Sequence, residues 1–190
     1  MILVISCSLS PTSRSRMLAE SARDCLAELD ETTEFIDLQK HTLPFCDGST
    51  AYQHPHAIEL NQLGQNADAI LLATPVYNFS VSATTKNLVE LTGRSWASKP
   101  VGMLLAAGGH GSYMAGMGLA NSLMLDFRCL VIPRFVYAGP SAFQGNQIGD
   151  PAVHTRIAEL AHELLRVSRA LKNAPPIISI PSPLNTPDES

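Results

Sequence analysis

The chain of 190 residues lacks most of the short motifs that mark nucleotide-binding and metal-binding proteins. It has no G-x-G-x-x-G run after its first apolar segment and no G-K-[S/T] sequence, so neither a Rossmann dinucleotide site nor an ATP-binding P-loop is predicted. Its four cysteines contain no C-x-x-C pair, which argues against a zinc ribbon and a disulfide framework. Unpaired cysteines favour a reducing compartment, and we expect the cytoplasm.

Charged residues and long hydrophobic runs are also scarce. Charged side chains make up 16% of the chain and the net charge is −4, so the basic surface that nucleic-acid binding requires is missing. No apolar run approaches the roughly 18–20 residues of a membrane span. The first ten residues, MILVISCSLS, lack the basic stretch of a signal peptide. We therefore expect a protein that binds neither nucleic acid nor membrane.

What the chain does have is an alternation of short apolar runs with longer amphipathic segments. Strands are expected at residues 1–6, 33–38, 68–74, 101–107 and 130–137, and helices at 16–29, 57–66, 83–92, 113–127 and 152–172. Pro75 is expected to end the third strand, and Pro133 favours an edge position for the fifth. This alternation predicts one α/β domain with a parallel sheet over residues 1–172, and a proline-rich tail over residues 173–190. Two strand orders remain open, 3-2-1-4-5 and 2-1-3-4-5.

The turn after the first expected strand is rich in hydroxyl groups. Five hydroxyl residues and two arginines stand within it: Ser8, Ser10, Thr12, Ser13, Arg14, Ser15 and Arg16. A helix that begins here offers free N–H groups and the positive end of its dipole. Together with the hydroxyls, this predicts a site for a phosphate monoester. The competing interpretation is an ordinary helix cap, because serine and threonine favour that position.

Two further loops follow the third and fourth expected strands. The first contains Pro75, Val76, Tyr77, Asn78 and Phe79; the second contains Gly108, Gly109 and His110. In the order 2-1-3-4-5 the first of these loops lies beside the hydroxyl-rich turn, at the point where such folds bind ligands. Aromatic walls and closely approaching glycine backbone suit an isoalloxazine ring. Alternatively, the two aromatic side chains cover the core and His110 lies idle in solvent.

These residues resemble the NADPH-dependent FMN reductase family of flavodoxin-like proteins. Ser8, Ser13 and Ser15 match the polar positions of a G-S-x-R-x-x-S-x-[N/S]-x-x-L-A loop, and Leu18-Ala19 follows them. The likeness continues through residues 73–78, 86–88, 108–109 and 130–133, and spans about residues 1–172. It is greatest to reductases that supply reduced FMN to two-component monooxygenases. Two positions depart from the pattern: Cys7 replaces the loop glycine and Ser10 the loop arginine, which leaves Arg14 as the candidate to supply the missing charge.

The resemblance implies a flavodoxin-like, doubly wound, five-stranded parallel sheet of order 2-1-3-4-5 with helices on both faces. It implies FMN as cofactor, NAD(P)H as co-substrate, and hydride transfer to the flavin without a catalytic acid, base or metal. Homodimers or homotetramers are common in the family. The expected cofactor-binding residues are Ser8, Ser10, Ser13, Arg14, Ser15, Pro75, Val76, Tyr77, Asn78, Phe79, Gly108, Gly109 and His110.

Other functions stay open on the sequence. The first is a reductase of quinones, azo dyes or chromate that retains its FMN through turnover. The second is a non-enzymatic electron carrier of the flavodoxin type, against which the mild net charge argues. The third is a regulatory flavin-binding module.

Overall fold

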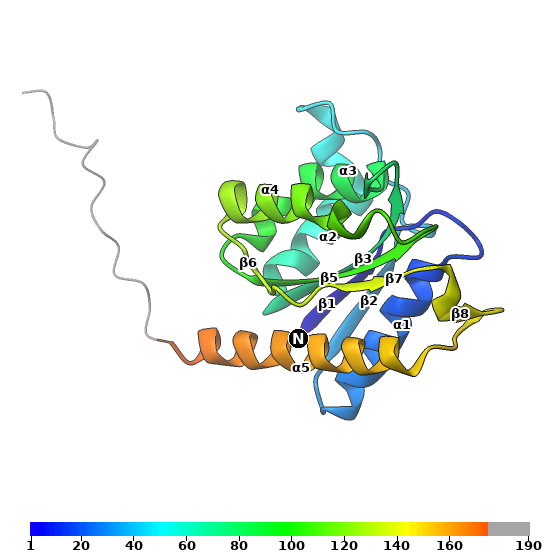
Figure 1. Ribbon diagram of the computed structural model, residues 1–190. Coiled ribbons are helices and arrows are strands. Elements are labelled where there is room, and N and C mark those ends of the chain that lie inside the picture. The colour runs from blue at the N-terminus through cyan, green and yellow to red at the C-terminus, as the bar shows by residue number, and fades with distance from the viewer. Residues whose placement is uncertain (175–190) are drawn as a thin grey trace, which may run out of the picture.

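Helices cover both faces of a central sheet (Figure 1). The computed structural model describes residues 1–174, so the expected tail falls outside the described residues from residue 175 onward. The helices are α1 (Arg14–Glu28), α2 (Pro55–Asn66), α3 (Ala83–Thr92), α4 (Met117–Phe127) and α5 (Pro151–Lys172), with short 3₁₀ turns at Thr50–Gln53, Gly93–Trp96, Tyr113–Gly116 and Pro140–Ala142. Over this part of the chain, no helix is both long and apolar enough to cross a membrane.

The sheet has seven strands, and its parallel strands follow the flavodoxin-like order. Its strands are β1 (Ile2–Ser6), β2 (Thr33–Asp37), β3 (Ala69–Tyr77), β4 (Ser80–Val81), β5 (Pro100–Ala107), β6 (Leu130–Val131) and β7 (Val136–Ala138). The order is β2-β1-β3-β5-β6, with β7 also parallel to β5 and β4 antiparallel to β3. A separate hairpin joins β8 (Phe143–Gln144) to β9 (Gln147–Ile148). The expected order is therefore confirmed, whereas the expected count of five strands is wrong.

The fifth expected strand, 130–137, is interrupted rather than continuous. β6 pairs with β5 as far as Val131 and β7 resumes the pairing at Val136, so four residues of the outer strand lie opposite two of β5. Pro133 lies inside this interruption and has no N–H to donate to the ladder. The position at the edge of the sheet agrees with the expectation from this proline.

The expectation that Pro75 ends the third strand is also wrong, because β3 continues to Tyr77. β1 is paired with β3 only as far as Ala73, so the missing N–H of Pro75 removes no bond between these two strands. On that side the Pro75 carbonyl instead accepts a hydrogen bond from the N–H of Ser82, 3.1 Å away. The strand can therefore pass through proline and carry Tyr77 beyond the edge of the parallel sheet.

Side chains on alternate positions of the strands form two apolar cores, one on each face. α1 and α5 pack with Ile2 and Val4 of β1, whereas α2, α3 and α4 lie on the face to which Leu3 and Ile5 point. Gly102 of β5 leaves room for side chains of its neighbours, since an added Cβ would lie 2.7 Å from Leu71 of β3 and 3.3 Å from Leu160 of α5. This packing fixes the carboxyl ends of β1, β3 and β5, from which the candidate site is built.

Candidate functional site

Two adjoining cavities lie at the carboxyl ends of β1, β3 and β5, and they share Val76. The first, of about 360 Å³, is lined by Ser8, Ser10, Thr12, Ser13, Arg14, Ser15, Pro75, Val76, Tyr77, Ala106, Ala107 and Gly108. The second, of about 310 Å³, is lined by Val76, Asn78, Phe79, Gly109, Gly111 and Ser112. All three expected loops thus meet at one edge of the sheet. Of the thirteen predicted site residues, only His110 lines neither cavity.

The first cavity lies at the start of α1. The Ser13 side chain caps this helix and accepts a hydrogen bond from the Arg16 N–H at 3.0 Å. The first N–H groups of a helix have no acceptor within it, so those of Arg14 and Ser15 remain for a ligand. Ser8 and Ser15 are buried beside them. The interpretation as a helix cap is therefore confirmed for Ser13, and the same helix N-terminus lines the cavity, so the phosphate site stays a prediction.

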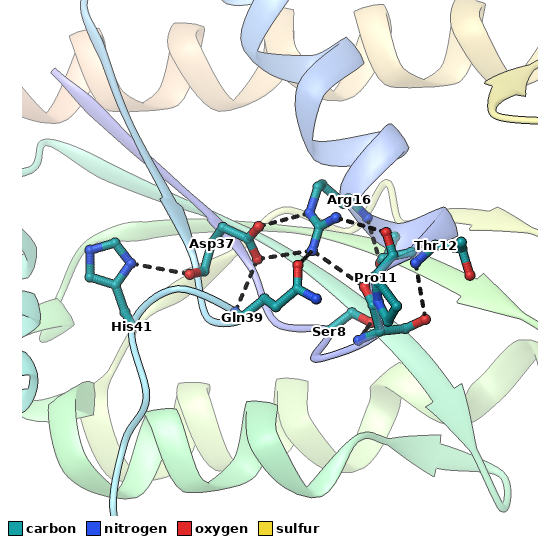
Figure 2. A network of polar contacts seen from close by, with 10 residues as sticks. Ser8, Pro11, Thr12, Arg16, Asp37, Gln39 and His41 are labelled. Atoms are coloured by element: carbon teal, nitrogen blue, oxygen red, sulfur yellow. Dashed lines mark hydrogen bonds and ion pairs between the residues drawn. The ribbon is translucent and has the colours of Figure 1, made fainter.

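The two arginines of this turn take different positions. Arg14 lines the first cavity and places its guanidinium carbon 5.3 Å from the centre of the Phe143 ring. Arg16 turns away from the cavity and forms an ion pair with Asp37, with 2.8 Å between Nε and Oδ2 (Figure 2). Of the two arginines, Arg14 is therefore the one whose charge remains available to an anionic ligand.

The hairpin between β3 and β4 forms a wall of the second cavity. Its two turn residues, Asn78 and Phe79, have φ angles of +49° and +60°, as a type I′ turn requires. Asparagine tolerates this left-handed conformation, whereas a phenylalanine in it is strained. The Phe79 side chain is 74% exposed and that of Tyr77 is 56% exposed. The alternative in which these rings cover the core is therefore wrong.

The loop after β5 is held by a residue that the sequence did not single out. The Tyr137 hydroxyl of β7 donates a hydrogen bond to the Gly109 carbonyl and accepts one from Ser112, at 2.9 Å. His110 packs instead against Gly139, where an added Cβ would lie 2.8 Å from its ring. No short motif marks Tyr137, because its role depends on strands that pair far apart in sequence.

The Cys7 thiol, which lies beside this site, is buried and unreactive. Cys7 follows β1 and is fully buried, and burial raises the pKa of its thiol to about 12, despite a hydrogen bond with Thr85 that lowers it. Its carbonyl accepts a hydrogen bond from Thr84. The side chain therefore stays protonated near neutral pH and offers no nucleophile. Across residues 1–174, no group of three histidine, cysteine or acidic side chains is arranged to hold a metal ion.

The sequence model of the family described as "NADPH-dependent FMN reductase" matches residues 1–144. The chain belongs to this family. The predicted family is thus confirmed, together with FMN and NAD(P)H as the cofactor and co-substrate that define it. The matched region contains every residue that lines the two cavities.

Known relatives agree with this membership. The chain is 28% identical over 161 residues to an NAD(P)H-dependent FAD/FMN reductase of Geobacillus thermodenitrificans, covering 83% of this chain and 85% of the relative. It is 33% identical over 138 residues to an NADPH:quinone oxidoreductase of Arabidopsis thaliana, covering 70% and 68%. Among solved structures, the flavoenzyme NAD(P)H:acceptor oxidoreductase FerB of Paracoccus denitrificans has a TM-score of 0.72 at 20% identity, over 89% of this chain and 97% of FerB. That likeness shows the shared fold.

Proposed function

We propose that this protein is an NAD(P)H-dependent FMN reductase that exchanges its flavin and supplies reduced FMN to a partner monooxygenase. The donor set of the first cavity fits the phosphate of FMN, because it combines hydroxyl groups, free helix N–H groups and one guanidinium. The second cavity has loop backbone and the exposed Phe79 ring to accommodate the isoalloxazine. When bound, FMN supplies the hydride chemistry, and the residues of this chain position it.

The observation that carries flavin exchange is the charge of the first cavity. The family's usual loop arginine is Ser10 here, and Arg16 is paired with Asp37. Arg14 is therefore the single cationic side chain among the residues that line the cavity. Hydrogen bonds to a phosphate dianion are stronger from charged donors than from neutral ones, so a site with mostly neutral donors holds FMN less tightly.

A second candidate is a reductase of quinones that retains FMN through turnover. The Arabidopsis relative named NADPH:quinone oxidoreductase favours it, since this chain covers about two thirds of that protein. The two candidates share fold, cofactor and co-substrate. They differ in whether FMN leaves after reduction, so the strength of flavin binding decides between them.

Two further parts of the proposal concern assembly and location. We propose a homodimer or homotetramer, and a cytoplasmic location in which the four unpaired cysteines remain reduced. Exposed Tyr113 and Met114, 64% and 63% accessible, lie on the turn after the glycine loop and offer apolar surface beside the site. Sedimentation velocity of the full chain tests the assembly.

The deciding experiment follows NADPH and NADH oxidation at 340 nm while free FMN is varied. An exchanging reductase shows turnover that rises and saturates with added FMN, and it loses its flavin on gel filtration. A retaining enzyme elutes yellow, turns over without added FMN and responds to added quinone. A protein that binds FMN but oxidises neither nucleotide contradicts both candidates and leaves a carrier or a regulatory module.

The contribution of Arg14 is tested with a matched arginine on the same helix. Arg23 lies 5.3 Å from the Phe35 ring centre, just as Arg14 lies 5.3 Å from that of Phe143, but it is remote from the cavity. We expect Arg14→Ala to weaken FMN binding about tenfold, as loss of one charged hydrogen bond does, and Arg23→Ala to leave it unchanged. Equal effects of both substitutions would contradict the assignment of Arg14 to the phosphate.

A further inference from the structure

Arg16 lies in the first turn of α1 but points back along the loop that precedes the helix. Its side chain is only 17% exposed, and it does not line the cavity formed by its neighbours. Figure 2 shows its guanidinium between the loop on one side and the end of β2 on the other. A buried guanidinium in this position has donors for several acceptors at fixed angles, which a lysine does not.

On the loop side, the guanidinium binds two consecutive backbone carbonyls. Nη1 donates to the Pro11 carbonyl and Nη2 to the Ser10 carbonyl, each at 3.3 Å. These two oxygens carry partial negative charge that a phosphate would repel. Arg16 does not line the cavity, so its hydrogen bonds turn the Ser10 and Pro11 carbonyls toward a guanidinium that does not itself contact a ligand there. Ser10 still lines the cavity, while its N–H donates to Ser8 Oγ at 3.2 Å and its Oγ accepts from the Thr12 N–H at 3.3 Å.

On the other side, the guanidinium is neutralised and anchored. Asp37, at the end of β2, lies 2.8 Å from Nε through Oδ2, and its Oδ1 accepts from Nη2 at 3.3 Å. The Asp37 side chain is 9% exposed, so solvent screens this pair little. Gln39 accepts a further bond from Nη2 at 2.7 Å, and its own N–H donates to Asp37 Oδ1 at 3.1 Å. The charge of Arg16 is therefore balanced by Asp37.

We infer that Arg16, anchored by Asp37, is a positioning residue that sets the preference for FMN over riboflavin through the shape of the loop and not through its charge. The inference rests on the proposed function, because it concerns the phosphate of the same flavin. Arg16 fixes the backbone of residues 10 and 11 with their carbonyls turned toward its guanidinium and away from the phosphate. The hydroxyl oxygens of Ser8 and Ser10 already accept the N–H groups of Ser10 and Thr12, so their hydroxyl hydrogens are left to donate to the phosphate. Riboflavin has no phosphate, so its binding does not depend on this arrangement.

Two variants separate shape from charge. Arg16→Lys keeps the positive charge beside Asp37 but loses the planar fork that reaches both carbonyls. The double variant Arg16→Met/Asp37→Asn removes both charges together, because Arg16→Met alone would leave a buried carboxylate without its partner. Arg23→Lys, at an exposed position of the same helix, is the matched control. Dissociation constants for FMN and for riboflavin are measured by flavin fluorescence, with thermal melting to confirm folding.

We expect both Arg16 variants to bind FMN about tenfold or more weakly and riboflavin within about twofold of the original protein. The control should change neither. Retention of FMN affinity by Arg16→Lys would overturn the inference, since charge alone would then suffice. A parallel loss of both flavins would overturn it as well, because the role would be general stability. Failure of the original chain to bind FMN would instead refute the proposed function, before any variant is compared.

Discussion

The strained turn at Phe79 predicts an unusual order of stability between two substitutions. Phe79 has φ +60°, and a left-handed conformation costs a residue with a Cβ roughly 1–2 kcal/mol. Glycine adopts this conformation without strain, but its larger loss of conformational entropy on folding costs roughly 0.5–1 kcal/mol. Phe79→Ala retains the strain and Phe79→Gly relieves it, while both remove the ring. The glycine variant should therefore be more stable than the alanine variant by about 1 kcal/mol.

Urea unfolding of both variants measures this difference in the free energy of unfolding directly. In thermal unfolding, a chain of this size should show a Tm difference of about 2–4 °C. Asn121 provides the matched control, because it is exposed within α4 and has ordinary helical geometry. There the order should reverse, with Asn121→Ala more stable than Asn121→Gly by about 1 kcal/mol. If Phe79→Ala equals or exceeds Phe79→Gly in stability, the assignment of strain to this turn is refuted.

The same pair of variants also tests why the strain is kept. Strained backbone persists at sites where function requires the residue. The Phe79 ring lines the second cavity, so both variants should bind FMN more weakly and to a similar degree. A glycine variant that gains stability and keeps full flavin affinity would show that the ring serves some purpose other than flavin binding.

Three further predictions concern the loops and thiols around the site. Ser13→Ala should lower the free energy of unfolding by about 1 kcal/mol in urea, because α1 loses its N-cap, and should also weaken FMN binding. Tyr137→Phe should lower the free energy of unfolding by about 0.5–1.5 kcal/mol, because the Gly109 carbonyl loses its donor, and should raise the Kd for FMN measured by fluorescence. In the native protein at pH 8, at most two of the four thiols should react with Ellman's reagent. Burial raises the pKa of Cys7 to about 12 and that of Cys129 to about 11, so these two thiols stay protonated. All four thiols should react after denaturation. Reaction of Cys7 in the native state would contradict its burial.

The sequence by itself determined the parallel α/β architecture and the place of the ligand loops. Apolar runs buried on both faces specify parallel strands, and helical spacing specifies the elements that cover them. The hydroxyl-rich turn at residues 8–15 could be predicted to begin a helix and to line a cavity, because helix caps and helix N-termini depend on neighbouring residues. The strand boundaries near proline could not be predicted from the sequence. The effect of a missing N–H depends on whether a neighbouring strand offers a carbonyl that this N–H would otherwise bond.

Only the tertiary structure decided which of the predicted residues line the two cavities and which residues support them. Arg14 and Arg16 look alike in sequence, but an ion pair with Asp37, 21 residues away, neutralises only Arg16. Tyr137 reaches Gly109 across 28 residues because β5 and β7 lie side by side in the sheet. Such pairings depend on how distant strands are brought together, and no local pattern of residue types encodes that distance. The sequence could therefore supply the residue types of the candidate site, whereas the fold decided which of them face the cavities and which are paired elsewhere.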